Sequence, residues 1–150
     1  MEVNELGHVV LYVRNLDRSR RFYRDVLGWA EVGNMPLGAS AVAFSSGRTH
    51  HELLLIEVGE DAASLPPGRR VGMYHFGLKV GTTDDELRAA LASLRAAGVP
   101  VSGTADHTVT HSLYLADPDG NEIELYIDVQ PEVWREDPDS VLAPLRPLRL

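Results

Sequence analysis

Residues 122–129 read EIELYIDV, in which acidic or aromatic side chains alternate with large aliphatic ones. Successive side chains of a β-strand point to opposite faces, so this stretch predicts a strand with one polar and one buried face. The stretch HELLLIEV at residues 51–58 lies 71 residues earlier and has a similar order of side chains. His8 lies in an apolar, β-branched stretch that predicts a strand buried on both faces, and His75, 67 residues later, lies in a second stretch that predicts a buried strand. These similar offsets indicate an internal repeat.

The sequence of each repeat predicts secondary-structure elements in the order β-α-β-β-β. In the first repeat, the apolar runs and helical spacing predict elements at residues 6–13, 17–27, 29–33, 40–45 and 51–58. In the second repeat they predict elements at residues 73–80, 84–97, 99–105, 111–116 and 122–129. Asp17 is expected to cap the first helix and Thr83 to open a capping box for the second. Gly28 and Gly98, 70 residues apart, are expected to end the two helices.

The pattern as a whole predicts an α+β fold with two tandem βαβββ modules that form a curved mixed sheet around a metal cleft. The modules are expected at about residues 5–58 and 72–129, joined by a linker at 59–71 that contains proline and glycine. They would make one domain at residues 1–130. The tail at 131–150 carries four prolines and no clear periodicity, so we expect an extended arm with short turns there.

Composition excludes several classes of function. The chain has 150 residues, 44% of them hydrophobic, which is enough for a sizeable core. Its formal charge of -8 argues against partners such as nucleic acid or an anionic membrane surface. It has no cysteine, so any metal must be held by His, Asp or Glu. The absence of a long apolar run or a leader-like start leads us to expect a cytoplasmic protein.

His8, His75 and Glu124 are candidate metal ligands. If the two repeats pack about a pseudo-twofold axis, the two histidines occupy equivalent places and Glu124 supplies a third donor. Two imidazoles and one carboxylate form the ligand set of non-haem Fe(II) oxygen chemistry, although Mn(II), Zn and Ni also accept such donors. A single histidine in a buried strand is more often a hydrogen-bonded core residue. Two at equivalent positions beside a carboxylate favour the metal site.

Two segments resemble the signatures of the vicinal oxygen chelate superfamily. GHVVLYVRNLDRSRRFYRDVLGW at residues 7–29 is similar to its opening signature, and YLADPDGNEIELY at 114–126 to its closing one. The superfamily includes glyoxalases, bleomycin and fosfomycin resistance proteins and type I extradiol catechol dioxygenases. The resemblance covers roughly residues 5–130 and implies that the metal ligands are His8, His75 and Glu124.

Other residues resemble the extradiol dioxygenase branch. The segment RTHHELLL at 48–55 is similar to one that carries a catalytic histidine, here His51. Tyr114 precedes Glu124 by ten residues, where those enzymes have a substrate-binding tyrosine. HTVTHSLYL at 107–115 is similar to a segment with another active-site histidine, for which both His107 and His111 remain open, with His107 the better match. Strand alternation would place His51, Leu53 and Leu55 on the face equivalent to that of Glu124, and Leu53 would replace a fourth carboxylate ligand.

The resemblance implies an Fe(II)-dependent enzyme, with Mn(II) as an alternative metal, that cleaves a catechol-type aromatic diol with dioxygen beside its hydroxyl groups. His51, Tyr114 and His107 would be the catalytic residues, with His51 as the acid–base residue. His107, Tyr114 and His50 would also bind the substrate. A homodimer or a higher homo-oligomer is expected. The alternatives are a glyoxalase-like lyase, for which Glu52 and Glu57 stay candidate ligands, a fosfomycin thiol transferase, and a metal-free protein that sequesters a drug.

Overall fold

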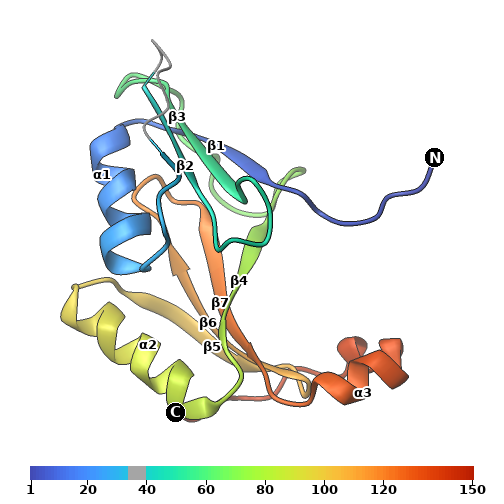
Figure 1. The fold of residues 1–150 in the computed structure, drawn as a ribbon. Helices are drawn as coiled ribbons and strands as arrows, with labels where there is room; N and C mark the ends of the chain where they lie inside the picture. The colour runs from blue at the N-terminus through green and yellow to red at the C-terminus, as the bar shows by residue number, and fades with distance from the viewer. Residues whose placement is uncertain (34–39) are drawn as a thin grey trace. The chain divides into compact units, whose positions relative to one another are not determined.

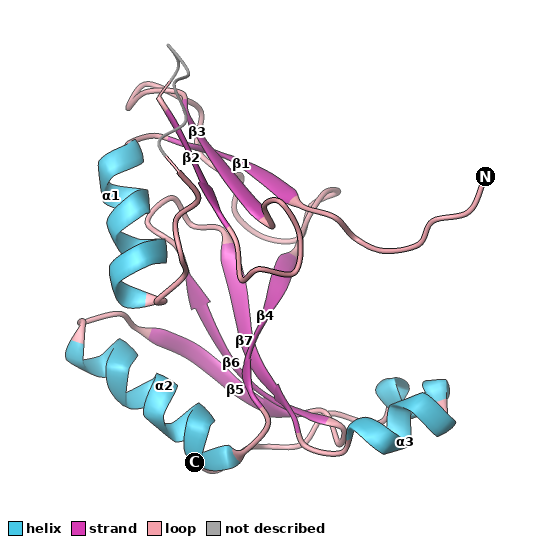
Figure 2. Ribbon diagram, viewed as in Figure 1, coloured by secondary structure: helices cyan, strands magenta, loops and turns pink. Residues whose placement is uncertain are grey.

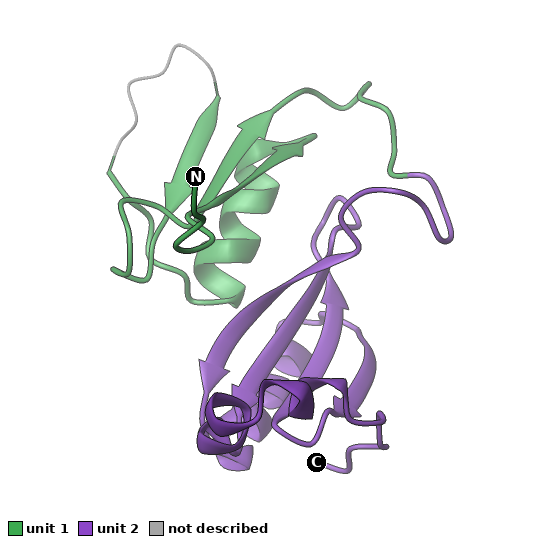
Figure 3. Cartoon of the chain, turned by 90° about the vertical axis from the view of Figure 1, so that its right-hand side faces the viewer, with its two compact units in different colours: residues 1–65 green, residues 66–150 purple. Residues whose placement is uncertain are grey.

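A computed structural model of the protein describes residues 1–33 and 40–150. The chain divides into unit 1, Met1–Leu65, and unit 2, Pro66–Leu150 (Figure 3). Each unit contains one mixed sheet with a helix on one face, so the expected α+β fold is confirmed (Figure 1). No helix in the described part of the chain is long and apolar enough to span a membrane.

Unit 1 is built on a three-stranded sheet in the order β1-β3-β2 (Figure 2). Its strands are β1 (Val9–Val13), β2 (Ala41–Phe44) and β3 (Leu53–Glu57). β3 runs parallel to β1 and antiparallel to β2. The helical segment consists of α1 (Leu16–Arg21) and a π-helical turn, η1 (Phe22–Val26). It packs on the sheet face that holds the core side chains Leu11, Val13, Val42, Phe44, Leu53 and Leu55.

The cap of the first helix lies two residues before the expected one. Asn15, not Asp17, is the N-cap, and its Oδ1 accepts a 2.9 Å hydrogen bond from the backbone N–H of Arg18. Asn15 has the extended backbone that an N-cap requires, whereas Asp17 already lies inside the first turn. Gly28 has a φ of 71° and follows the helix as expected.

Two expectations for unit 1 were wrong. Residues 29–33 form a single antiparallel bridge, Glu31 to Phe44, instead of a strand. The first strand is not buried on both faces, because Val10 and Tyr12 are 46% and 71% exposed. α1 covers one face only, so the alternate side chains of β1 stay accessible even though they are apolar.

Unit 2 has the predicted order β-α-β-β-β. Its sheet has the order β4-β7-β6-β5, with β4 (His75–Gly81) parallel to β7 (Glu122–Asp128). β5 (Val101–Asp106) and β6 (Thr110–Ala116) complete it by antiparallel pairing. Strand β4 is also partly exposed along its length, so the expectation of a second fully buried strand was wrong.

Helix α2 (Asp84–Ala96) covers one face of this sheet. The predicted capping box is present: Thr83 Oγ1 accepts from the backbone N–H of Glu86, and the Glu86 carboxylate accepts from that of Thr83. Leu87, Leu91 and Leu94 are buried toward the sheet, and Gly98 follows the helix with a φ of 70°. Burial of each such leucine stabilises the fold by about 1.5–3 kcal/mol.

The C-terminal tail is helical in part, where an extended arm was expected. α3 (Pro131–Glu136) is followed by a 3₁₀ helix, η2 (Pro138–Leu142). Both begin with a proline, whose fixed φ suits the first helical turn and whose missing N–H costs nothing there. Beyond them, Arg146 pairs with Asp106 through two backbone hydrogen bonds of 2.9 and 3.0 Å, which tie the tail to β5.

Candidate functional site

The polar face of β7 carries the core of the candidate site. Ile123, Leu125 and Ile127 are buried on the side of α2. The alternate side chains on the opposite face are all partly exposed, as the sequence pattern predicted: Glu122, Glu124, Tyr126 and Asp128.

His75 lies against this face. In the parallel pairing of β4 with β7, His75 is the Cα partner of Glu122, and Gly77 is the partner of Glu124. His75 Nε2 is 3.2 Å from Glu124 Oε2. A Cβ at position 77 would lie 3.2 Å from the Tyr126 ring and 3.8 Å from Glu124 Oε2. Glycine therefore leaves open the space beside the carboxylate.

Tyr114 and His107 extend the cluster on the other side of Glu124. Tyr114 is the Cα partner of Glu124 across β6 and β7, and its hydroxyl donates a 2.9 Å hydrogen bond to Glu124 Oε1. His107 Nε2 lies 2.7 Å from the same hydroxyl. Because the only hydroxyl proton of Tyr114 goes to Glu124, His107 Nε2 must be the donor in the second contact. Burial and the hydrogen bond to Glu124 raise the pKa of Tyr114, which keeps it protonated.

The position of His107 depends on the turn between β5 and β6. Asp106 Oδ1 accepts a 2.7 Å bond from the backbone N–H of Thr108, whose φ of 74° is unusual for a β-branched residue. His111, the alternative from sequence, lies on the opposite face of β6. Its Nδ1 is 2.6 Å from Asp84 Oδ1 at the start of α2. Of the two histidines, only His107 therefore belongs to the cluster around Glu124.

Unit 1 brings together three other histidines. The His8 ring lies 4.5 Å from the His51 ring and 5.9 Å from the His50 ring, measured between centroids. His50 Nδ1 and His51 Nδ1 are 2.6 Å apart, so one of them donates a proton to the other. Burial, followed by the neighbouring His50 and His8, lowers the pKa of His51. At neutral pH His51 is therefore a neutral imidazole that can accept a proton.

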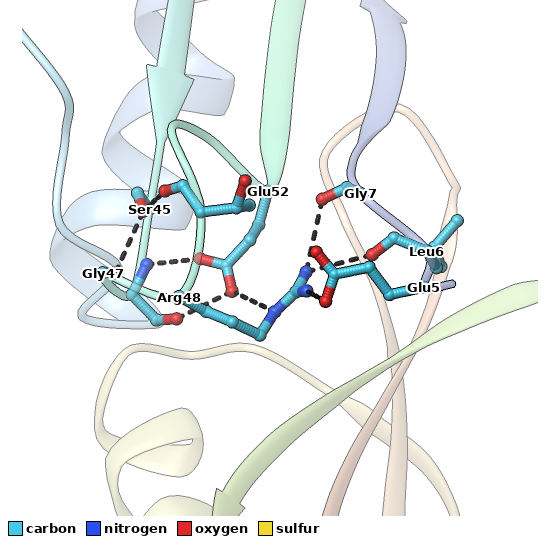
Figure 4. A network of polar contacts seen from close by, with 9 residues as sticks. Glu5, Leu6, Gly7, Ser45, Gly47, Arg48 and Glu52 are labelled. Carbon is cyan, nitrogen blue, oxygen red and sulfur yellow. Dashed lines mark hydrogen bonds and ion pairs between the residues drawn. The ribbon is translucent and has the colours of Figure 1, made fainter. Parts of the chain in front are cut away.

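Arg48 holds the two segments that carry these histidines (Figure 4). Its guanidinium donates to Glu52 Oε1 at 3.1 Å, to Glu5 Oε2 at 3.2 Å, and to the carbonyl oxygens of Leu6 and Gly7 at 3.1 and 3.2 Å. The other Glu52 oxygen accepts from the backbone N–H of Ser46. The segment before His8 is thus joined to the loop before β3. Arg48 was not predicted from the sequence, because no motif marks a residue that acts by bonding to backbone carbonyls.

The strand register corrects one expectation about the repeat. Val9 pairs with Leu53 in unit 1, so the place opposite His8 belongs to Glu52, as Glu122 lies opposite His75. The counterpart of Glu124 is therefore Leu54, at an offset of 70 residues, and not Leu53. Leu53 and Leu55 are fully buried in the core of unit 1. His51 lies before the start of β3, so the alternation of side chains along the strand does not determine which face His51 is on.

The residues of unit 2 fit a divalent metal ion. Two donors about 2.1 Å from one ion and at right angles to each other are about 3 Å apart, close to the 3.2 Å between His75 Nε2 and Glu124 Oε2. Imidazole nitrogen and carboxylate oxygen suit Fe(II) or Mn(II). Within residues 1–33 and 40–150, no group of three His, Asp or Glu side chains is arranged to hold a metal. His8 lies in unit 1, so the complete trio stays a prediction.

A protein-family model matches most of the chain. The family model described as Glyoxalase/Bleomycin resistance protein/Dioxygenase superfamily matches residues 5–125. A solved structure of a glyoxalase/dioxygenase from Nostoc punctiforme superposes with a TM-score of 0.67 at 20% identity, covering 83% of this chain and 90% of that one. At this identity the likeness concerns the fold alone.

Several curated relatives are named as dioxygenases. Catechol-2,3-dioxygenase of Bacillus subtilis is 36% identical over 136 residues, which cover 91% of this chain and 46% of the relative. Biphenyl-2,3-diol 1,2-dioxygenase 3 of Rhodococcus globerulus is 35% identical over 126 residues, or 82% and 63% of the two chains. An iron-dependent extradiol dioxygenase of Rhodococcus jostii is 31% identical over 147 residues, which cover 86% of this chain and 46% of the relative. The chain thus spans about half to two thirds of the length of these relatives.

Proposed function

Because this chain belongs to the Glyoxalase/Bleomycin resistance protein/Dioxygenase superfamily, we propose that it cleaves the ring of a catechol-type diol with dioxygen, using Fe(II). The observation that carries the proposal is the continuous set of contacts in unit 2 from His75 through Glu124 and Tyr114 to His107. A lyase or a sequestering protein gives no reason for Tyr114 and His107 beside the carboxylate. The ring-cleaving relatives are consistent with this choice.

His8, His75 and Glu124 would hold the metal, which would supply Lewis-acid and redox chemistry for the reaction of the diol with dioxygen. The name of the Rhodococcus jostii relative supports iron, with Mn(II) as the alternative. Cleavage of the carbon–carbon bond next to the diol would place both oxygen atoms in a muconic semialdehyde-type product.

The side chains around the metal would bind the substrate and move protons. Neutral His51 would accept a proton from a diol hydroxyl and return it to oxygen as the ring opens, since its lowered pKa favours the neutral form. His107 Nε2 and the Tyr114 hydroxyl would orient the diol oxygens through hydrogen bonds. His50 would bind the substrate at the edge of the histidine cluster. We further propose that the chain acts as a homo-oligomer in the cytoplasm.

The test is to load the purified chain with Fe(II) without oxygen, add catechol, and follow oxygen uptake and the yellow ring-opened product after exposure to air. A parallel sample with Mn(II) distinguishes the two metals. Alanine at His75 or Glu124 should abolish metal binding, whereas His51→Ala should keep the metal and slow turnover. Absence of product with several catechols, together with tight binding of an antibiotic, would overturn the proposal in favour of drug sequestration.

A further inference from the structure

The His75 imidazole, on β4, lies between two carboxylates of β7, those of Glu122 and Glu124. Its Nε2 is 3.2 Å from Glu124 Oε2, and its Nδ1 is 3.6 Å from Glu122 Oε1. The second contact follows from the strand register, because His75 and Glu122 are direct partners between β4 and β7. The proposed chemistry uses Glu124 and the Nε2 atom, and it leaves Glu122 and the Nδ1 atom without a role.

The Nδ1 atom of His75 is buried and has no hydrogen-bond partner within the described part of the chain. A buried imidazole N–H that is not hydrogen-bonded costs free energy, so this atom needs an acceptor. Glu122 Oε1, at 3.6 Å, is beyond the usual N–H···O range of about 2.7–3.2 Å by only a few tenths of an ångström. A small rotation of the Glu122 side chain, which is 33% exposed, would close that distance.

We propose that Glu122 is a positioning residue that accepts a hydrogen bond from His75 Nδ1–H and thereby keeps Nε2 deprotonated and turned toward the metal. A histidine that binds a metal through one nitrogen commonly donates its other N–H to a carboxylate, which fixes the tautomer and makes the ligand nitrogen more basic. The inference rests on the proposed function, since it assigns a partner to one of its metal ligands.

The surroundings of Glu122 fit this role. The Tyr74 hydroxyl interacts with the Glu122 carboxylate, and this hydrogen bond raises the pKa of Tyr74. Glu122 therefore has a second partner, Tyr74, beside His75. Asp128 lies on the same face of β7 as Glu122 but has a different partner, because it forms an ion pair with Lys79 at 2.5 Å. The two carboxylates thus have the same strand and face but different partners, and Asp128 provides a matched control.

The experiment measures Fe(II) binding to the metal-free full chain by anaerobic calorimetry. Glu122→Leu removes the acceptor and should raise the Kd for Fe(II) by about 100-fold, while Glu122→Gln keeps a weaker acceptor and should raise it by about 10-fold. Asp128→Leu and Asp128→Asn should bind Fe(II) like the parent chain. Thermal unfolding of all four variants checks that the fold is kept. Equal Fe(II) affinity of Glu122→Leu and the parent chain would overturn the inference.

A second measurement needs no metal and separates this inference from the proposed function. The nitrogen-15 NMR signal of His75 Nδ1, assigned with His75→Ala, should shift in Glu122→Leu and stay in place in Asp128→Leu. If the parent chain binds Fe(II) no better than His75→Ala does, the proposed function fails. The nitrogen-15 signal of His75 Nδ1 then still tests whether Glu122 accepts its hydrogen bond. A His75 Nδ1 signal that is the same with and without Glu122 contradicts the pairing.

Discussion

Tyr114 donates a 2.9 Å hydrogen bond to Glu124 and is its direct partner across β6 and β7. The tyrosine therefore contacts a proposed metal ligand and would lie beside a substrate bound at that site. Tyr114→Phe removes this bond to a charged group, which is worth about 1.5–3 kcal/mol. We expect kcat/KM for catechol to fall by about 10- to 100-fold, because each 1.4 kcal/mol is a factor of ten.

The control for this variant is Ser102→Ala. Ser102 also bonds to Tyr114, but to its backbone carbonyl, at 3.1 Å. Removal of this exposed hydroxyl should leave kcat/KM within about twofold of the parent. Steady-state oxygen uptake with the Fe(II)-loaded proteins measures both effects. Equal kcat/KM values in Tyr114→Phe and Ser102→Ala would argue against a substrate role for the tyrosine.

Arg48→Met should loosen the segment before His8 more than it destabilises the whole fold. Arg48 is 46% exposed, so the loss of its ion pairs should lower the free energy of unfolding by less than about 1 kcal/mol. The backbone N–H of Val9, which donates to the Glu52 carbonyl at 2.9 Å, should exchange with solvent several times faster, because Arg48 no longer joins the segment before it to Glu52. Hydrogen exchange tests this. Arg88→Met, which removes an ion pair with Asp85 in unit 2, should leave the exchange of the Val9 amide unchanged.

His107 and His111 should behave in opposite ways when each is replaced by alanine. His111→Ala leaves Asp84 without its imidazole partner and should lower the free energy of unfolding by about 1–2 kcal/mol. Turnover per bound Fe(II) should stay close to that of the parent. His107→Ala should lower turnover and change stability little. Urea unfolding and product formation, both normalised to bound metal, distinguish the two, and a reversed pattern would reassign the active-site histidine.

Glu86 should make the fold sensitive to acid. Hydrogen bonds from the backbone N–H of Thr82, and from the hydroxyl and N–H of Thr83, lower the pKa of Glu86. A carboxyl group whose pKa is lower in the folded chain stabilises the fold above its unfolded-state pKa, and this contribution is lost as pH falls through the folded-state pKa.

Glu86→Gln cannot be protonated in this range, so its stability should depend less on pH. The difference between urea midpoints at about pH 7 and about pH 3 should be smaller in Glu86→Gln than in the parent. Glu132→Gln, at the start of α3, provides a comparison on a helix where no capping box is present. A pH dependence of Glu86→Gln equal to that of the parent would contradict the assignment.

Strand and helix order could be predicted from sequence where the pattern was regular. EIELYIDV alternates strictly, and its polar and buried faces were predicted correctly. In HELLLIEV the central residues are all leucine or isoleucine, so nothing in the sequence fixes the register, and a slip of one residue reverses the faces. That slip explains why Leu53 was assigned to the face that belongs to Leu54. Only the pairing of Val9 with Leu53 settles the register.

Some residues of the candidate site could be predicted from sequence and others could not, because some contacts depend on long-range strand pairing. Tyr114 and His107 come from recognisable segments, and the structure brings them together around Glu124. Glu122 lies in the same segment, yet its closeness to His75 depends on the parallel pairing of β4 and β7, which is a long-range feature. The cap at Asn15 was misplaced because Asn and Asp are equally good caps and stand two residues apart.

Glu52 and Glu122 occupy the same register position in the two units, opposite His8 and His75. One glutamate is bonded to Arg48 and Ser46 and fixes a loop, whereas the other faces an imidazole. The same residue type at the same register position thus has different partners in the two units. Those partners are set by the neighbouring side chains, Arg48 in unit 1 and His75 in unit 2.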